Sequence, residues 1–249
     1  SSTGDLYLDP DAVAAHLAAT TEAGLQGGFH VIGDAGMDTV LDGLDRAARL
    51  VGERALQGAG HRLEHAELID PEGIERLARH AVTVSVQPGF DAAWGGPGGL
   101  YEQRLGPGRA AAMNPLASFY RAGVPVALGS DAPVVPLSPW ETVRACLEHH
   151  DPEQRISARA AFLASTRGAW RAARHPDPMQ GQLAPGTPAT FAVWDVEALM
   201  VQQAEGTGSS WSTDPRARTP LLPALDGAAL PVCRQTVLDG VELFRSDGW

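Results

Sequence analysis

The chain has no lysine, and all 19 of its basic residues are arginine. This absence excludes Schiff-base chemistry, a lysine that contacts a bound phosphate and a carboxylated lysine that bridges two metal ions. The 30 acidic residues outnumber the basic ones and give a formal net charge of −11. No cluster of basic residues is dense enough for nucleic acid. We therefore expect no nucleic-acid partner.

Cysteine is also scarce. Cys146 and Cys233 lie far apart, so they form neither a CxxC pair nor a disulfide framework. Two buried thiols in a reducing cytoplasm are the favoured interpretation. No run of about 18 apolar residues occurs, so no membrane partner is expected. Residues 1–5 lack the basic and apolar regions of a signal peptide and lack an initiator Met, which indicates processing or a piece of a longer protein.

Strand-like apolar runs alternate with amphipathic helix patterns through most of the chain. Helices are predicted over residues 10–22, 37–51, 71–80, 109–122, 138–147 and 157–174. Strands are predicted over residues 25–31, 61–66, 82–86 and 126–130. Such alternation predicts a parallel sheet and the α/β class. The glycine-rich stretch 94–99 does not match a phosphate-binding loop, and it is expected to be irregular, in a long loop of the kind that often covers a site.

The pattern changes near Pro176. Residues 190–195 alternate like a strand, and residues 202–212 resemble a flexible loop. Two further strands are predicted over residues 232–244, with a hairpin turn at Asp239 and Gly240. We therefore expect one domain over residues 1–176 and a small β domain over residues 177–249.

Three chemically useful side chains lie at or next to the carboxyl ends of predicted strands, namely His30, His65 and Asp131. Taken singly, a strand-end histidine is more often structural, and Asp131 could cap the following turn. Carboxyl ends of parallel strands meet at one edge of a sheet. Two neutral imidazoles and a carboxylate suit a divalent metal such as zinc and leave room for water. Together these residues predict a metal site in which Asp131 can also move a proton.

Four runs of residues then occur in a recognisable order. They are FHVIGD at 29–34, HRLEHA at 61–66, SVQP at 85–88 and LGSDAP at 128–133. Together they resemble the amidohydrolase superfamily, specifically its YtcJ-like family 3 branch. Residues 181–195 also resemble the segment by which that branch returns to its β domain.

The resemblance implies a metal-dependent (β/α)8 barrel with a small β-sandwich. Residues 1–176 would be the C-terminal half of the barrel, strands five to eight, and residues 177–249 part of the sandwich. His30, His65 and Asp131 would bind one or two divalent ions, zinc first among them, with Asp131 as general acid and base.

Several neighbouring residues have a less certain part in this interpretation. Glu64 and Arg62 would orient His65, or else form only a packing ion pair. Gln87 would line the pocket. Asp34 is expected to cap the helix after His30, and His61 to be a plain strand residue. The other histidines are expected at the surface, and they are His16, His80, His149, His150 and His175. Trp94, Tyr101 and Arg104 would either meet the substrate or pack at the surface.

The family pattern is incomplete in this chain. It contains no His-x-His, which the family places on its first strand, and nothing before His30 supplies strands one to four. A half barrel would leave two strand edges and an apolar inner face open. The missing half would come from the same polypeptide or from another chain, or the half barrel would pair with itself.

Two classes of function follow. The first is a hydrolase in which metal-activated water attacks an amide-type C–N bond of a small-molecule substrate, with an ester or a ring left open as the target. The second is a non-catalytic half-barrel that acts as an assembly or regulatory partner.

Overall fold

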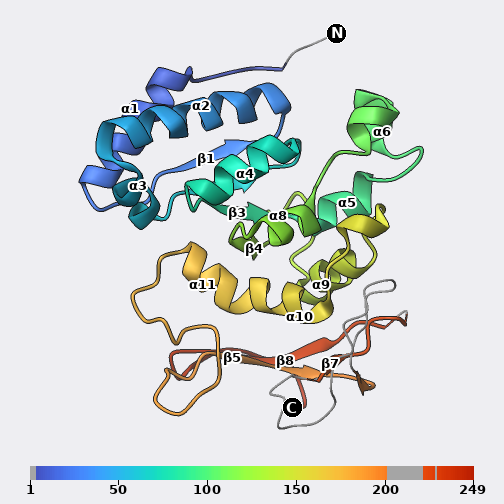
Figure 1. Cartoon of the computed structure of the whole chain (residues 1–249). Coiled ribbons are helices and arrows are strands. Elements are labelled where there is room, and N and C mark those ends of the chain that lie inside the picture. Colours follow the sequence, from blue (N-terminus) through green and yellow to red (C-terminus); the bar gives the residue numbers. More distant parts are fainter. Residues whose placement is uncertain (1–3, 201–220, 228) are drawn as a thin grey trace.

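A four-stranded parallel sheet forms the centre of the computed structural model, which describes residues 4–200, 221–227 and 229–249 (Figure 1). The strands are β1 (Gly28–Val31), β2 (Arg62–His65), β3 (Thr83–Val86) and β4 (Val126–Leu128), in the order β1-β2-β3-β4. Parallel register pairs Val31 with His65 and Val86 with Leu128. The carboxyl ends of all four strands therefore lie at one edge. The predicted α/β class with a parallel sheet is confirmed.

Helices alternate with the strands as the sequence pattern predicts, with α1 (Pro10–Glu22) before β1, α2 (Asp34–Val51) after β1 and α4 (Pro71–Arg79) after β2. A short helix that the sequence pattern does not predict, α3 (Glu53–Ala59), follows α2. Asp9 and Asp70 cap α1 and α4, because their carboxylates accept from the backbone N–H groups of Ala12 and Gly73. The cap predicted for Asp34 is wrong by one residue: Gly33 is the N-cap of α2, and Asp34 lies in its first turn.

Residues 95–99 are irregular, as predicted for the glycine-rich stretch. Its flanks are helical, contrary to the long loop expected there, and contain α5 (Pro88–Trp94), α6 (Leu100–Leu105) and α7 (Pro107–Ala110). The glycines join these short helices rather than abolish them. A Cβ on Gly95 would lie 2.5 Å from Asp91 Oδ1 and 2.8 Å from His150 Nδ1, so only glycine lets the chain pass there.

The helix predicted over residues 109–122 is wrong in its first half. Asn114 takes a left-handed conformation (φ 55°), and Pro115 precedes α8 (Leu116–Ala122), so the chain turns before the helix begins. After β4 come α9 (Pro139–Leu147) and a 3₁₀ turn (Pro152–Gln154). The helix expected over residues 157–174 is divided into α10 (Ala158–Leu163), a π turn (Ala164–Gly168) and α11 (Ala169–Ala172).

A small antiparallel sheet follows, formed by β5 (Phe191–Asp195), β8 (Val232–Leu238) and β9 (Val241–Arg245). The hairpin turn is confirmed, because Asp239 and Gly240 both have positive φ. A separate pair joins β6 (Leu199–Met200) to β7 (Leu222–Pro223). Figure 1 shows α10 and α11 between the two sheets. The loop expected over residues 202–212 lies outside the described residues.

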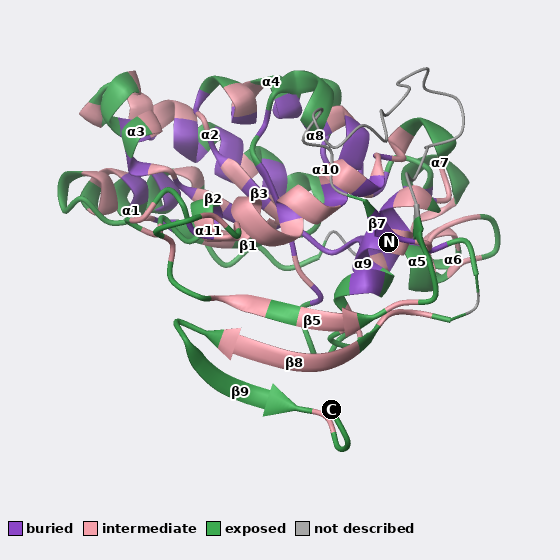
Figure 2. Ribbon diagram, turned by 90° about the horizontal axis from the view of Figure 1, so that it is seen from below, coloured by how far each residue is buried: buried purple, intermediate pink, exposed green. Residues whose placement is uncertain are grey.

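The core lies on one face of the parallel sheet and under its helices, whereas the small sheet is half-buried or exposed (Figure 2). Burial alternates along β2 and β3: Leu63 and Val84 are buried against the helices, whereas Glu64 and Ser85 are half-buried. The open face of the sheet is therefore polar. The expectation of an apolar inner face is wrong, because the alternation places polar residues there.

The parallel sheet has two unpaired edges. Within the described residues, β1 and β4 are each hydrogen-bonded to one neighbouring strand, so the four strands do not close on themselves. Both edges are short, at four and three residues.

Among the helices that the structure describes, none combines the length and the apolar character that a membrane span requires.

The prediction that five histidines lie at the surface is wrong for part of the set. His16 is exposed, but His80 and His149 are 3% and 1% exposed, and His150 and His175 are half-buried. The predicted burial of both thiols holds for Cys146, whose pKa is raised by burial, while Cys233 is half-buried.

His80 lies in an ion-pair network on the helical side of the sheet. Its Nε2 is 2.7 Å from Asp45 Oδ1, and its Nδ1 is 2.9 Å from Glu53 Oε1. Arg76 also donates to Asp45, at 2.6 Å. Burial tends to raise the pKa of the Asp45 carboxyl, but the hydrogen bonds from His80 and Arg76 outweigh it and lower this pKa below its ordinary value of 3.8.

This lowered pKa predicts a pH-dependent effect of Asp45→Asn. A carboxyl with a depressed folded-state pKa stabilises the fold above its unfolded pKa, and this stabilisation is lost as the pH falls through the folded pKa. Asp45→Asn should therefore lower Tm at neutral pH, and the difference from wild type should shrink below about pH 4. Thermal unfolding at several pH values measures it. Asp42→Asn, at a more exposed partner of Arg76, is the control and should have a smaller effect. A loss of Tm that is the same at every pH would contradict the prediction.

Candidate metal centre

His30 and His65 meet at the carboxyl edge of the sheet. His30 is on β1, and His65 is the last residue of β2. The two ring centroids are 5.1 Å apart, and His30 Nδ1 lies 3.0 Å from His65 Nε2. His65 takes a left-handed backbone conformation (φ 75°), which is uncommon for a residue with a side chain. The structure thus brings together two of the three predicted ligands.

His65 is held from more than one side. Its Nδ1 is 2.9 Å from Gln87 Oε1. The ring of Phe90 stacks on the imidazole of His65 at an interplanar angle of 14°. The side chains of His65 and Gln87 are both buried, at 6% exposed. Gln87 therefore touches His65 and lines the same small cavity, together with Asn114 and His149.

Asp131 follows β4 at the same edge of the sheet. Its backbone is left-handed (φ 54°), and its side chain is exposed. Within the described residues, no hydrogen bond or ion pair joins this side chain to His30 or His65. The three residues share an edge, but their ligand atoms do not form a compact group in this chain. The role of Asp131 therefore stays a prediction.

Arg62 and Glu64 form an ion pair, with Arg62 Nε 2.6 Å from Glu64 Oε1. The register places Glu64 beside His30 and beside Ser85 on the polar face of the sheet. The alternation of β2 directs Glu64 away from the side of the sheet on which Leu63 is buried. The observed contact is the ion pair between the two residues, and an orienting effect on His65 stays a prediction.

His61 has a structural role. Its Nδ1 accepts from the backbone N–H of Gly27 at 2.9 Å, and its Nε2 lies 2.9 Å from Thr21 Oγ1. Burial lowers the pKa of this imidazole. His61 directly precedes β2 rather than lying in the strand as predicted, and its hydrogen bonds tie the start of β2 to α1.

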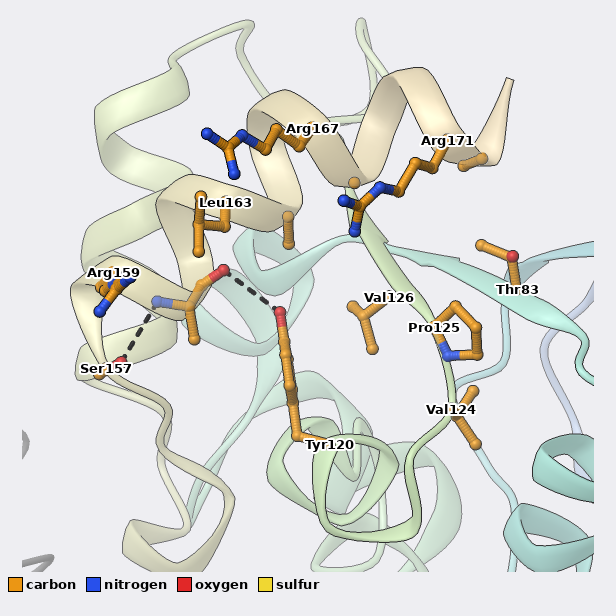
Figure 3. Close-up of a pocket in the computed structure, with 14 residues that line it drawn as sticks. Thr83, Tyr120, Val124, Pro125, Val126, Ser157, Arg159, Leu163, Arg167 and Arg171 are labelled. Atoms are coloured by element: carbon orange, nitrogen blue, oxygen red, sulfur yellow. Dashed lines mark hydrogen bonds between the residues drawn. The ribbon is translucent and has the colours of Figure 1, made fainter. Parts of the chain in front are cut away.

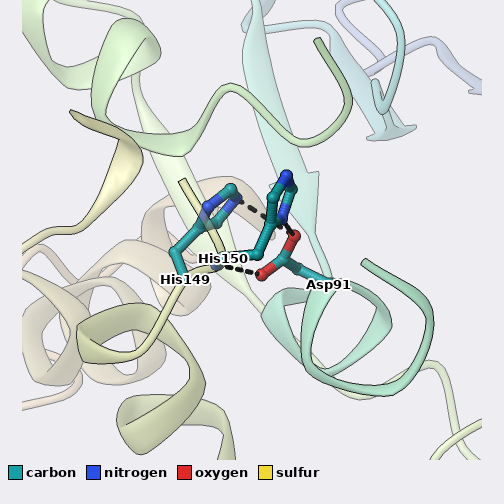
Figure 4. A group of neighbouring side chains, drawn as sticks. All are labelled: Asp91, His149 and His150. Atoms are coloured by element: carbon teal, nitrogen blue, oxygen red, sulfur yellow. Dashed lines mark hydrogen bonds and ion pairs between the residues drawn. The ribbon is translucent and has the colours of Figure 1, made fainter. Parts of the chain in front are cut away.

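A second group of metal-ligand residues was not expected from the sequence. Asp91, His149 and His150 are the one trio in the described residues whose ligand atoms all lie within 4.8 Å of one another (Figure 4). Asp91 Oδ1 contacts His150 Nδ1 and lies 3.4 Å from His149 Nε2. Asp91 is 58 residues or more from the histidines in sequence, so no spacing signalled the cluster.

The hydrogen bonds of His149 argue against metal binding at this trio. Its Nδ1 accepts from the backbone N–H of Asp151 at 3.1 Å, so in the neutral ring the hydrogen is on Nε2. That Nε2–H faces the backbone oxygen of Asn114 at 3.0 Å. Burial lowers the pKa of His149, which favours this neutral form. The trio is therefore a hydrogen-bonded link between α5 and the end of α9.

Residues 88–105 cover the end of β2. An aromatic series runs from His65 through Phe90 and Trp94 to Tyr101, with centroid separations of 6.1, 4.8 and 6.0 Å. Tyr101 donates to Glu67 Oε2 at 2.6 Å, and burial raises the pKa of the Glu67 carboxyl. Trp94 and Tyr101 thus pack within the protein, while Arg104 is exposed.

A cavity of ≈ 410 Å³ lies elsewhere, between α8 and the α10–α11 segment (Figure 3). Its lining includes Thr83, the first residue of β3, and Val124, which precedes β4. It therefore opens near the amino ends of the strands. Arg159, Arg167 and Arg171 also line it, but Figure 3 shows these side chains spread along the helix rather than aimed at one point.

Comparisons with known proteins agree with this arrangement. Protein LONG AFTER FAR-RED 3 of Arabidopsis thaliana is 31% identical over 204 residues, covering 76% of this chain and 33% of that protein. The putative amidohydrolase YtcJ of Bacillus subtilis is 29% identical over 142 residues, covering 56% of this chain and 25% of that protein. The chain thus spans a third or less of these curated relatives.

Solved structures share the fold. An uncharacterized metal-dependent hydrolase from Pyrococcus furiosus aligns with a TM-score of 0.63 at 24% identity, over 76% of this chain and 37% of that one. Atrazine chlorohydrolase TrzN from Arthrobacter aurescens, complexed with zinc, aligns with a TM-score of 0.58 at 20% identity, over 97% of this chain and 49% of that one. The model of the amidohydrolase family matches residues 3–244. The chain therefore belongs to the amidohydrolase family, in its YtcJ-like family 3 branch.

Proposed function

We propose that this chain supplies half of a metal-dependent hydrolase that cleaves an amide-type C–N bond of a small molecule. The observation that carries the proposal is the 3.0 Å approach of His30 Nδ1 to His65 Nε2 at the carboxyl edge of the sheet. Two nitrogen ligands on one tetrahedral zinc, each at about 2.0–2.1 Å, lie about 3.3 Å apart. The donor pair therefore fits zinc closely. Two relatives described as a metal-dependent hydrolase and as a zinc complex support the same choice of cofactor.

The residues would divide the work as follows. His30, His65 and Asp131 would hold one or two divalent ions, zinc first among them. A bound ion would supply activated water and polarise the carbonyl of the substrate. Asp131, exposed at the end of β4, would take a proton and pass it to the leaving amine. Gln87 would hold His65 in place, and Arg62 and Glu64 would support the polar face on which His30 lies.

We further propose that residues 1–176 are strands five to eight of a (β/α)8 barrel and that residues 177–249 are part of a β-sandwich. The unpaired edges of β1 and β4 and the polar open face support this, because a polar interior suits a substrate cavity. The coverage of 49% of the TrzN chain also supports this. The other half would come from the same polypeptide or from a second chain, in a cytoplasmic enzyme.

Analysis of the complete protein tests the proposal. We expect an intact mass well above 26.2 kDa or a second co-purifying chain, with zinc, manganese or iron retained and hydrolysis of N-acyl amides. Mass spectrometry, metal analysis and an amide panel measure these. If the complete protein retains no metal and gains no activity on added metal, the non-catalytic half-barrel is the better description.

A further inference from the structure

Gln87 has two fixed contacts at the end of β3. Its Nε2 donates to the backbone oxygen of Ser85 at 3.2 Å, and its Oε1 lies 2.9 Å from His65 Nδ1. The two contacts fix which end of the Gln87 amide is the oxygen and which is the nitrogen. The reversed amide would set its oxygen against the oxygen of Ser85, and two acceptors cannot share a hydrogen bond.

The amide oxygen of Gln87 only accepts, so Nδ1 of His65 must carry the hydrogen. A neutral imidazole has one N–H, and its second nitrogen keeps a lone pair. In His65 that nitrogen is Nε2, the atom that faces His30. We propose that Gln87 is a positioning residue, which selects the Nδ1–H form of His65 and so makes Nε2 the ligand atom. This inference rests on the proposed metal site.

The surroundings resist a change of this arrangement. Gln87 and His65 are both 6% exposed, so a rotated His65 ring would leave a buried amide without its partner. Phe90 stacks against the ring and limits its tilt. Pro88 begins α5 directly after Gln87, and Asp91 fastens that helix to His150. Gln87 is therefore held at one end by the sheet and at the other by α5.

The test compares Gln87→Leu with Gln87→Glu in the full chain. Leucine removes both contacts of Gln87, whereas glutamate loses only the donor to the Ser85 oxygen and keeps an acceptor for His65 Nδ1, so the pair isolates the acceptor. Zinc affinity, measured by competition with a chromophoric chelator, should fall about 10–100-fold in Gln87→Leu and stay within a few-fold of wild type in Gln87→Glu. Gln57→Leu is the matched control, because Gln57 also donates to a backbone oxygen, that of Arg79, but far from the site.

A second readout does not depend on zinc. NMR of metal-free protein with ¹⁵N-labelled histidine should show His65 with a protonated Nδ1 and a bare Nε2, at a pH where the ring is neutral. The resonance is assigned by its loss in His65→Gln. The wild-type spectrum decides this point even if Gln87→Leu fails to fold.

The outcomes separate the two proposals. A wild-type His65 with its hydrogen on Nε2, or unchanged zinc affinity in Gln87→Leu, would overturn the role of Gln87 and leave the metal site standing. A wild-type protein with the Nδ1–H form but no zinc binding would overturn the metal site while the assignment of the hydrogen remained.

Discussion

Asp131→Asn is expected to lower kcat of the complete enzyme by about 10²- to 10⁴-fold, the usual cost of losing a general base. Asparagine nearly preserves the size of the side chain and can still offer an oxygen, but it cannot accept a proton at neutral pH. Asp131 is exposed, so the substitution should leave the fold intact.

Steady-state kinetics and metal analysis of the same preparation measure the effect. Asp38→Asn, at an exposed aspartate on α2, is the control and should behave as wild type. A kcat within a few-fold of wild type, with metal retained, would remove Asp131 from the chemistry.

His30→Ala is expected to weaken zinc binding by more than Gln87→Leu does, because it removes a ligand rather than its support. The loss should therefore exceed about 100-fold, and activity should fall with it. His30 is exposed on β1, so this variant should keep the Tm of the metal-free wild type.

Metal content after dialysis, with thermal unfolding of the metal-free protein, measures both effects. His16→Ala is the control. His16 is an exposed histidine that contacts Phe29 on β1, the strand of His30, but lies away from the site. Zinc retained at wild-type stoichiometry in His30→Ala would show that the pair of imidazoles is not the metal centre.

The parts of the fold that depend on neighbouring residues could be predicted from the sequence. Asp9-Pro10 and Asp70-Pro71 start α1 and α4. In each case the Asp carboxylate accepts a hydrogen bond from the backbone N–H three residues later, so the start depends only on neighbouring residues. Apolar runs predict the strands that carry His30 and His65, and the alternation of helices and strands predicts the parallel sheet.

The parts that depend on distant residues could not be predicted. His80 and His149 looked like surface residues because their partners, Asp45 and Asp91, are far away in sequence. The short helices around Gly95 were missed because glycine is typical of loops, whereas here it is required by the closeness of Asp91. Asp131 was found as a strand end, but its distance from the histidines depends on how the sheet curves.

The polar face of the parallel sheet has a consequence for how the protein is assembled. In the proposed half barrel, an apolar open face would bind other apolar surfaces before the second half arrived. The open face instead carries Glu64 and Ser85, and the unpaired edges are only four and three residues long. The proposal therefore implies that the half barrel resists aggregation while β1 and β4 remain able to pair with the strands of the other half.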